Sequence, residues 1–92
     1  MSTRFAEAIR DHRVVEFCYK GRTRSVEPHA VGYDASGALV LHGWDLSARG
    51  QGFRGFDLRE IRGLTVTRRS FDGPRPEHAS QPLPLHRLVC AL

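Results

Sequence analysis

Lysine is almost missing from this sequence. Lys20 is the only lysine, so 13 of the 14 basic residues are arginines. The guanidinium group is planar and always charged, and it binds phosphate or carboxylate through paired hydrogen bonds. The base composition of a GC-rich genome produces the same bias, so the total alone identifies no ligand. The formal net charge of +4 and the pI near 9.8 suit nucleic acids, nucleotides and acidic proteins alike.

Long apolar runs are also missing. No stretch of 18 apolar residues occurs, which excludes a membrane-spanning helix. No apolar run follows Arg4, so a secretory signal is not expected. We therefore expect a cytoplasmic protein without a membrane partner. The 92 residues form one small domain with a thin core, and a hydrophobic content of 40% is too high for a disordered chain at this charge.

Cysteine is scarce. Cys18 and Cys90 stand far apart, and neither belongs to a C-x-x-C pair or has a histidine at metal-ligand spacing. This excludes a disulfide framework and predicts no metal site. Cys18 lies within an apolar run, which predicts a buried thiol.

Catalytic motifs are absent as well. The sequence has no G-x-S-x-G, no H-E-x-x-H and no P-loop. Its five histidines are scattered, and a lone histidine beside a strand most often packs or faces solvent. Asp57 and Glu60 flank Arg59, which indicates charge compensation and not a catalytic carboxylate pair. We expect no enzyme activity and no cofactor.

Hydrophobic periodicity predicts one helix followed by strands. Residues 3–12 place Phe5, Ala8, Ile9 and His12 on one helical face. Alternating patterns predict strands at residues 14–19, 22–31, 38–44, 53–58 and 64–68. Pro28 favours an edge position or a bulge in the second of these. Five short strands, spaced about ten residues apart, predict a mostly β fold with an N-terminal helix and a small, strongly bent five-stranded barrel.

The composition changes after Phe71. We divide the chain into a domain at residues 1–71 and a proline-rich tail at residues 72–92, which holds four of the five prolines. The tail ends in an apolar stretch, residues 85–92, that is expected to dock as a strand or short helix on this chain or on a neighbour. If the tail docks on a neighbouring copy, it would hold a homodimer together. The arginines at positions 68, 69, 75 and 87 are assigned to composition and solubility.

Arginines alternate with aromatic residues in two parts of the predicted sheet. Arg54, Arg59 and Arg62 surround Phe53 and Phe56, Arg22 and Arg24 follow Tyr19, and Trp44 ends the third strand. Such surfaces can bind nucleotides or single-stranded nucleic acid, since the charges neutralise phosphate and the rings stack on bases. Arg54 shares its strand face with Phe56. A partly buried charge there needs either an internal carboxylate or an anionic ligand.

Five segments together resemble the WYL domain of bacterial regulators. They are FAEAIR (5–10), RVVEFCY (13–19), VEPHAV (26–31), LVLHGW (39–44) and FRGFDLREI (53–61). The Trp-Tyr-Leu triplet that names the family is missing near residues 38–41, and the printed sequence has no helix-turn-helix segment. The chain is therefore most similar to the short, stand-alone members.

The resemblance implies an Sm-like small β-barrel with an N-terminal helix. It also implies a regulatory module that binds nucleotide-like or single-stranded nucleic-acid ligands, in transcription regulation or phage defence, with a regulator protein as a partner. The ligand contacts it implies map to Arg54, Arg59, Tyr19 and His29, and Trp44 is the aromatic that could replace part of the missing triplet. The alternative function is a protein-interaction or homodimerisation module without a small ligand.

Overall fold

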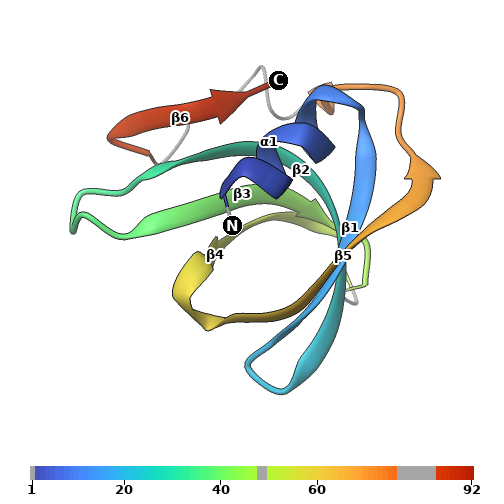
Figure 1. The fold of residues 1–92 in the computed structure, drawn as a ribbon, viewed down its shortest axis with the longest axis horizontal. Coiled ribbons are helices and arrows are strands. Elements are labelled where there is room, and N and C mark those ends of the chain that lie inside the picture. Colours follow the sequence, from blue (N-terminus) through green and yellow to red (C-terminus); the bar gives the residue numbers. More distant parts are fainter. Residues whose placement is uncertain (1, 48–49, 77–84) are drawn as a thin grey trace.

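The computed structural model describes residues 2–47, 50–76 and 85–92. Its elements in chain order are α1 (Ser2–Arg10), β1 (Arg13–Tyr19), β2 (Arg22–Tyr33), β3 (Leu39–Asp45), β4 (Gly52–Asp57), the 3-10 helix η1 (Leu58–Glu60), β5 (Ile61–Ser70) and β6 (Arg87–Ala91) (Figure 1). The helix ends before the predicted boundary because His12 adopts a positive φ of 53°, which turns the chain into β1.

The strands form one antiparallel sheet in the order β4-β3-β2-β1-β5, with β6 paired to β2 (Figure 1). The prediction of a mostly β fold with an N-terminal helix is therefore confirmed. Strands β4 and β5 lie at the two ends of the order, and no ladder joins them in the described part of the chain. The sheet is open, so a closed five-stranded barrel is not confirmed. The short helix η1, which connects these two strands, is too brief to leave a periodic signal in the sequence.

Strand β2 changes its neighbour along its length. It pairs with β1 up to Val26 and with β6 from Ala30 onward. Its ladder with β3 shifts register between Pro28 and Ala30, which confirms the bulge that Pro28 predicts. Glu27 and Pro28 therefore lie between the two ladders, while the carbonyl of His29 accepts a hydrogen bond from the main-chain N–H of Leu92, just after β6, at 2.8 Å.

Strand β6 forms from the terminal apolar stretch and docks on the same chain. This is one of the alternatives that the sequence left open. Docking depends on Gly32, where an added Cβ would lie 2.4 Å from the carbonyl oxygen of Arg87. Only glycine allows the two backbones to approach this closely.

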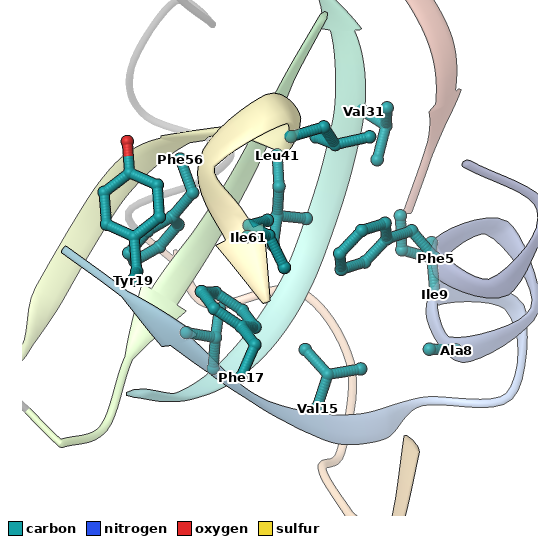
Figure 2. Packing of buried hydrophobic residues seen from close by; sticks show 12 residues of the cluster. Phe5, Ala8, Ile9, Val15, Phe17, Tyr19, Val31, Leu41, Phe56 and Ile61 are labelled. Atoms are coloured by element: carbon teal, nitrogen blue, oxygen red, sulfur yellow. The ribbon is translucent and has the colours of Figure 1, made fainter. Parts of the chain in front are cut away.

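The core lies between α1 and the inner side of the curved sheet (Figure 2). Phe5, Ala8 and Ile9 are buried on the helix, which confirms three of the four positions predicted for its apolar face. Opposite them lie Val15, Phe17, Tyr19, Val26, Val31, Leu41, Phe56, Leu58 and Ile61. His12, the fourth position, is only half-buried and stacks on Phe71 with ring centroids 5.4 Å apart.

The prediction of a buried Cys18 thiol is wrong, because Cys18 is exposed. Phe17 and Tyr19 point into the core, and alternation turns the residue between them to the other face. No helix of the described residues is long and apolar enough to cross a membrane.

Candidate functional site

The structure places three of the five predicted ligand residues in two clusters, while Tyr19 packs in the core and Arg59 pairs with Asp57. Trp44 and Asp45 are consecutive in β3, so their side chains point to opposite faces of the sheet. The inner cluster gathers around Asp45 and contains Arg54. The outer cluster contains Trp44 and His29.

Asp45 is the centre of the inner cluster and is fully buried. Its Oδ1 accepts hydrogen bonds from the main-chain N–H and the hydroxyl of Ser47, at 2.9 and 2.6 Å. Its Oδ2 accepts one from Nη1 of Arg24 at 3.0 Å and lies 3.4 Å from Nε of Arg54. Burial raises the pKa of Asp45, but the hydrogen bonds from Ser47 and Arg24 outweigh it, so the pKa lies below its usual value. The carboxylate is therefore ionised at neutral pH.

Two guanidinium groups share this one carboxylate, which leaves a net charge of +1 among the three side chains. Arg24 is the inner one: its side chain is 17% exposed, and its guanidinium lies about 6 Å from the rings of Tyr19 and Phe56. The side chain of Arg54 is 46% exposed and stands farther from Asp45. Of the two acceptors expected for Arg54, the internal carboxylate is present.

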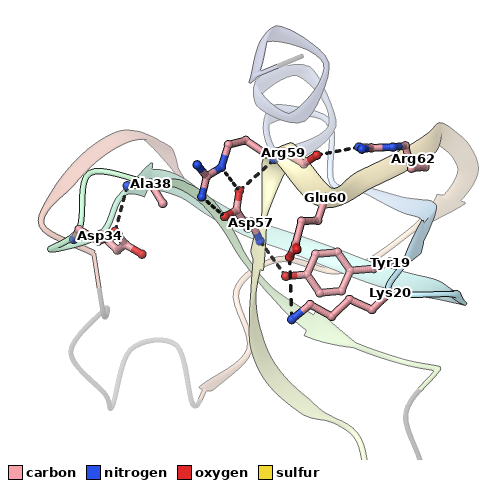
Figure 3. A network of polar contacts seen from close by, with 9 residues as sticks. Tyr19, Lys20, Asp34, Ala38, Asp57, Arg59, Glu60 and Arg62 are labelled. Atoms are coloured by element: carbon pink, nitrogen blue, oxygen red, sulfur yellow. Dashed lines mark hydrogen bonds and ion pairs between the residues drawn. The ribbon is translucent and has the colours of Figure 1, made fainter.

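Tyr19 has a packing role. Its ring meets Phe17 and Phe56 edge-on, with centroids 6.4 and 5.0 Å apart. Its hydroxyl accepts a hydrogen bond from the main-chain N–H of Asp57 at 3.1 Å (Figure 3). The ring is enclosed by these neighbours, and the hydroxyl fixes the point where β4 turns into η1.

Arg59 lies on η1 and binds its own neighbour. Its Nε and Nη2 donate to the two carboxylate oxygens of Asp57 at 3.1 and 2.7 Å (Figure 3). This confirms the predicted charge compensation, and these hydrogen bonds lower the pKa of Asp57. Glu60 pairs instead with Lys20 at 3.8 Å. The Arg59 side chain is 78% exposed, but its charge is already balanced.

The outer cluster is built on a second buried carboxylate, Glu27. Nε and Nη2 of Arg75 donate to its two oxygens at 2.7 and 2.8 Å. The Arg75 guanidinium also lies over the indole ring of Trp44, 4.6 Å from its centroid. Phe53 meets the same indole edge-on at 5.2 Å. Arg75 therefore has a function in the fold, and its assignment to composition and solubility is wrong.

His29 lies buried beside this pair. Its Nε2 accepts a hydrogen bond from the main-chain N–H of Arg75 at 3.0 Å, so Nδ1 carries the proton and donates to the Glu27 carbonyl at 2.8 Å. Phe71 stacks on the imidazole at 5.7 Å, and Phe53 meets it edge-on at 4.9 Å. The imidazole is neutral in this arrangement.

Sequence reasoning missed both buried carboxylates. Asp45 left a usable signal, since it shares strand parity with the buried Leu41 and Gly43. Glu27 stands beside the bulge at Pro28, where alternation fails, so no periodic signal marks it. The sequence places Arg24 near Tyr19 in the predicted sheet, but it gives no sign that Arg24 pairs with Asp45. No group of three or more metal-ligating side chains occurs among the described residues.

The comparisons with known proteins give one match. The family model described as "WYL domain" matches residues 2–66, which include the whole inner cluster and Glu27, His29 and Trp44, but not Arg75. No curated protein and no solved structure matches the chain.

Proposed function

The chain belongs to the WYL domain family, whose members are generally regulatory ligand-binding modules, and we propose that this one binds an anionic, nucleotide-like or single-stranded nucleic-acid ligand. Transcription regulation or phage defence, with a regulator protein as partner, is the proposed setting. The function is binding without catalysis. We also propose that the open sheet is the family's Sm-like small barrel, opened between β4 and β5.

The observation that supports anion binding is the half-exposed Arg54. It shares the buried Asp45 with Arg24, so the cluster has one positive charge more than it can neutralise internally. Arg54 stands 3.4 Å from the carboxylate and can turn toward a phosphate at low cost, while Arg24 holds Asp45 in place. Arg59 would contact the same anion only if its ion pair with Asp57 were broken.

The other predicted ligand residues fit an anion less well. Tyr19 is enclosed in the core, and His29 and Trp44 lie beside the buried carboxylate of Glu27. Arg75 already pairs with the Glu27 carboxylate, and its guanidinium covers the indole ring of Trp44, so this ring is less accessible for stacking on a base. We therefore centre the proposed site on Arg54.

Titration with mononucleotides, cyclic nucleotides and short single-stranded oligonucleotides at low salt tests the proposal. Arg54→Ala should weaken binding at least tenfold, and wild-type affinity should fall steeply as salt rises. Arg10→Ala is the matched control: it removes the same charge from an exposed side chain that pairs with Asp11, so it should bind like the wild type. Absence of binding to the whole panel, or equal affinity of Arg54→Ala and Arg10→Ala, would overturn the proposal.

A second candidate function, homodimerisation through the tail, is favoured by β6. Leu88 and Val89 are each 49% exposed and are the exposed large hydrophobic residues of the described chain. An exposed apolar edge strand can pair with a second copy. Measuring mass in solution for the wild type and for Val89→Lys tests this: a dimer that the substitution dissociates supports it, and a monomeric wild type excludes it.

A further inference from the structure

The segment of residues 71–76 is here called the strap. It crosses the outer face of the sheet between the part of β2 that pairs with β1 and the part that pairs with β6. Phe71 holds one end, since its main-chain N–H donates to the carbonyl of His12 at 3.0 Å and its ring stacks on His29. Arg75 holds the other end through Glu27, Trp44 and His29. A surface cavity of about 380 Å³ lies between Glu27 and residues 70–76. The strap thus rests on the sheet through a few specific contacts.

The contacts of Arg75 are those of a recognition site for a guanidinium group. The Arg75 guanidinium donates two hydrogen bonds, one to each oxygen of the Glu27 carboxylate, which is nearly fully buried. The guanidinium also lies over the indole ring of Trp44, and the imidazole of His29 accepts a hydrogen bond from the main-chain N–H of Arg75. Glu27, His29 and Trp44 come from β2 and β3, so they are positioned by the sheet and not by the strap. We name these three residues the guanidinium cradle.

We propose that the guanidinium cradle is a binding site for arginine in a proline-flanked segment, and that Arg75 between Pro74 and Pro76 is its built-in occupant. The cradle selects a cation, in contrast to the Arg54 cluster on the opposite face. Lysine would fill it poorly, because an ammonium group cannot form the paired hydrogen bonds to Glu27 or stack flat on Trp44. An arginine from a separate chain must compete with Arg75, whose tether gives it a high effective concentration.

The chain supplies its own reporter for this site. Trp44 is the only tryptophan, so the intrinsic indole fluorescence reports on whether a cation covers its ring. Arg75→Ala removes the guanidinium from Glu27 and Trp44, changes none of the three cradle side chains, and keeps the main-chain N–H that bonds to His29. A capped peptide with the sequence of residues 71–76 is then the probe, and the same peptide with lysine in place of arginine is its control.

Arg75→Ala should bind the arginine peptide saturably, with a change in Trp44 fluorescence and a rise in melting temperature. The lysine peptide should bind at least about tenfold more weakly. Wild-type protein should show little response, since Arg75 already fills the site. The double variant Arg75→Ala, Glu27→Gln should lose the response, because the paired acceptor is gone.

Arg87→Ala is the matched control variant. Arg87 also lies over an aromatic ring, that of Tyr33 at 4.8 Å, but it has no ion pair with a described carboxylate. In this variant Arg75 still fills the guanidinium cradle, so the peptide should have no effect on it. Equal responses to the arginine and lysine peptides, a response that survives Glu27→Gln, or no saturable response would overturn the proposal. If Arg75→Ala does not fold even with peptide, the same titration on Arg75→Lys decides, and no preference there for the arginine peptide overturns it.

Discussion

The main-chain N–H of Arg75 donates a hydrogen bond to Nε2 of His29, 46 positions earlier in the chain, across 3.0 Å. The other imidazole nitrogen donates to the carbonyl of Glu27 at 2.8 Å. His29 therefore joins the strap to the sheet through both nitrogens of a buried neutral ring. A histidine that is predicted to contact a ligand serves here as a structural connection.

His29→Phe should reduce the free energy of unfolding by about 2 kcal/mol, since a ring of similar shape still packs while two buried polar groups lose their partner. Urea unfolding measures the change. The exposed His86 offers the control His86→Phe, which should change stability by less than about 0.5 kcal/mol. An equal, small effect of both substitutions would show that the two hydrogen bonds contribute little.

The two cysteines should differ in reactivity. Cys18 is exposed, whereas Cys90 is half-buried and burial raises its pKa. The thiolate is the reactive form, so a disulfide reagent at pH 8 should modify Cys18 first and Cys90 more slowly. Cys18→Ser should remove the fast phase alone. A single phase for both thiols in the native protein would contradict the exposure that the structure assigns to them.

Local patterns in the sequence predicted the helix and the strands well, because each depends on neighbours in the chain. The strand at residues 14–19 and the bulge at Pro28 follow from alternation and from the missing N–H of proline. The open sheet could not be predicted in the same way, since closure depends on whether β4 and β5, at the two ends of the strand order, meet in space.

The candidate sites were less predictable, because their partners lie far apart in the sequence. Arg54 pointed to a buried acceptor, and strand parity marked Asp45 as buried, but nothing local showed that the two residues would meet. Glu27 and Arg75 are separated by 48 positions and meet only when the strap crosses the sheet. Cys18 shows the opposite failure: its strand parity was visible, but the apolar composition of the run outweighed it in the prediction.

Gly32→Ala should loosen the terminal strand. The added Cβ would meet the Arg87 carbonyl oxygen at 2.4 Å, so β6 must move away from β2. We expect faster hydrogen exchange at residues 87–91 and a loss of about 1–3 kcal/mol in stability. Gly52→Ala is the control, because an added Cβ there meets nothing within 4 Å. Unchanged protection of residues 87–91 in Gly32→Ala would show that β6 does not depend on this close approach.

Asp45→Asn should remove a pH-dependent part of the stability. The folded-state pKa of Asp45 lies below the ordinary value of 3.8, so its ionised form stabilises the fold fully above that value. As the pH falls through the depressed folded-state pKa, protonation removes this contribution. At pH 7 the free energy of unfolding of the wild type should therefore exceed that of Asp45→Asn by about 3 kcal/mol, because the variant leaves Arg24 without its buried charge partner.

The difference between the two proteins should shrink steadily below pH 3.8, and urea unfolding at several pH values between 7 and 2 measures it. Asp11, Asp34 and Asp57 also have lowered pKa values, but they are common to both proteins and cancel in the comparison. Asp72→Asn, at an exposed position, is the control for removing a carboxylate and should change the free energy of unfolding at pH 7 by less than about 0.5 kcal/mol. If the difference in free energy of unfolding between the wild type and Asp45→Asn stays constant down to pH 2, the prediction is wrong. Asp45 would then contribute through its shape beside Arg24 and Arg54, and not through its ionised carboxylate.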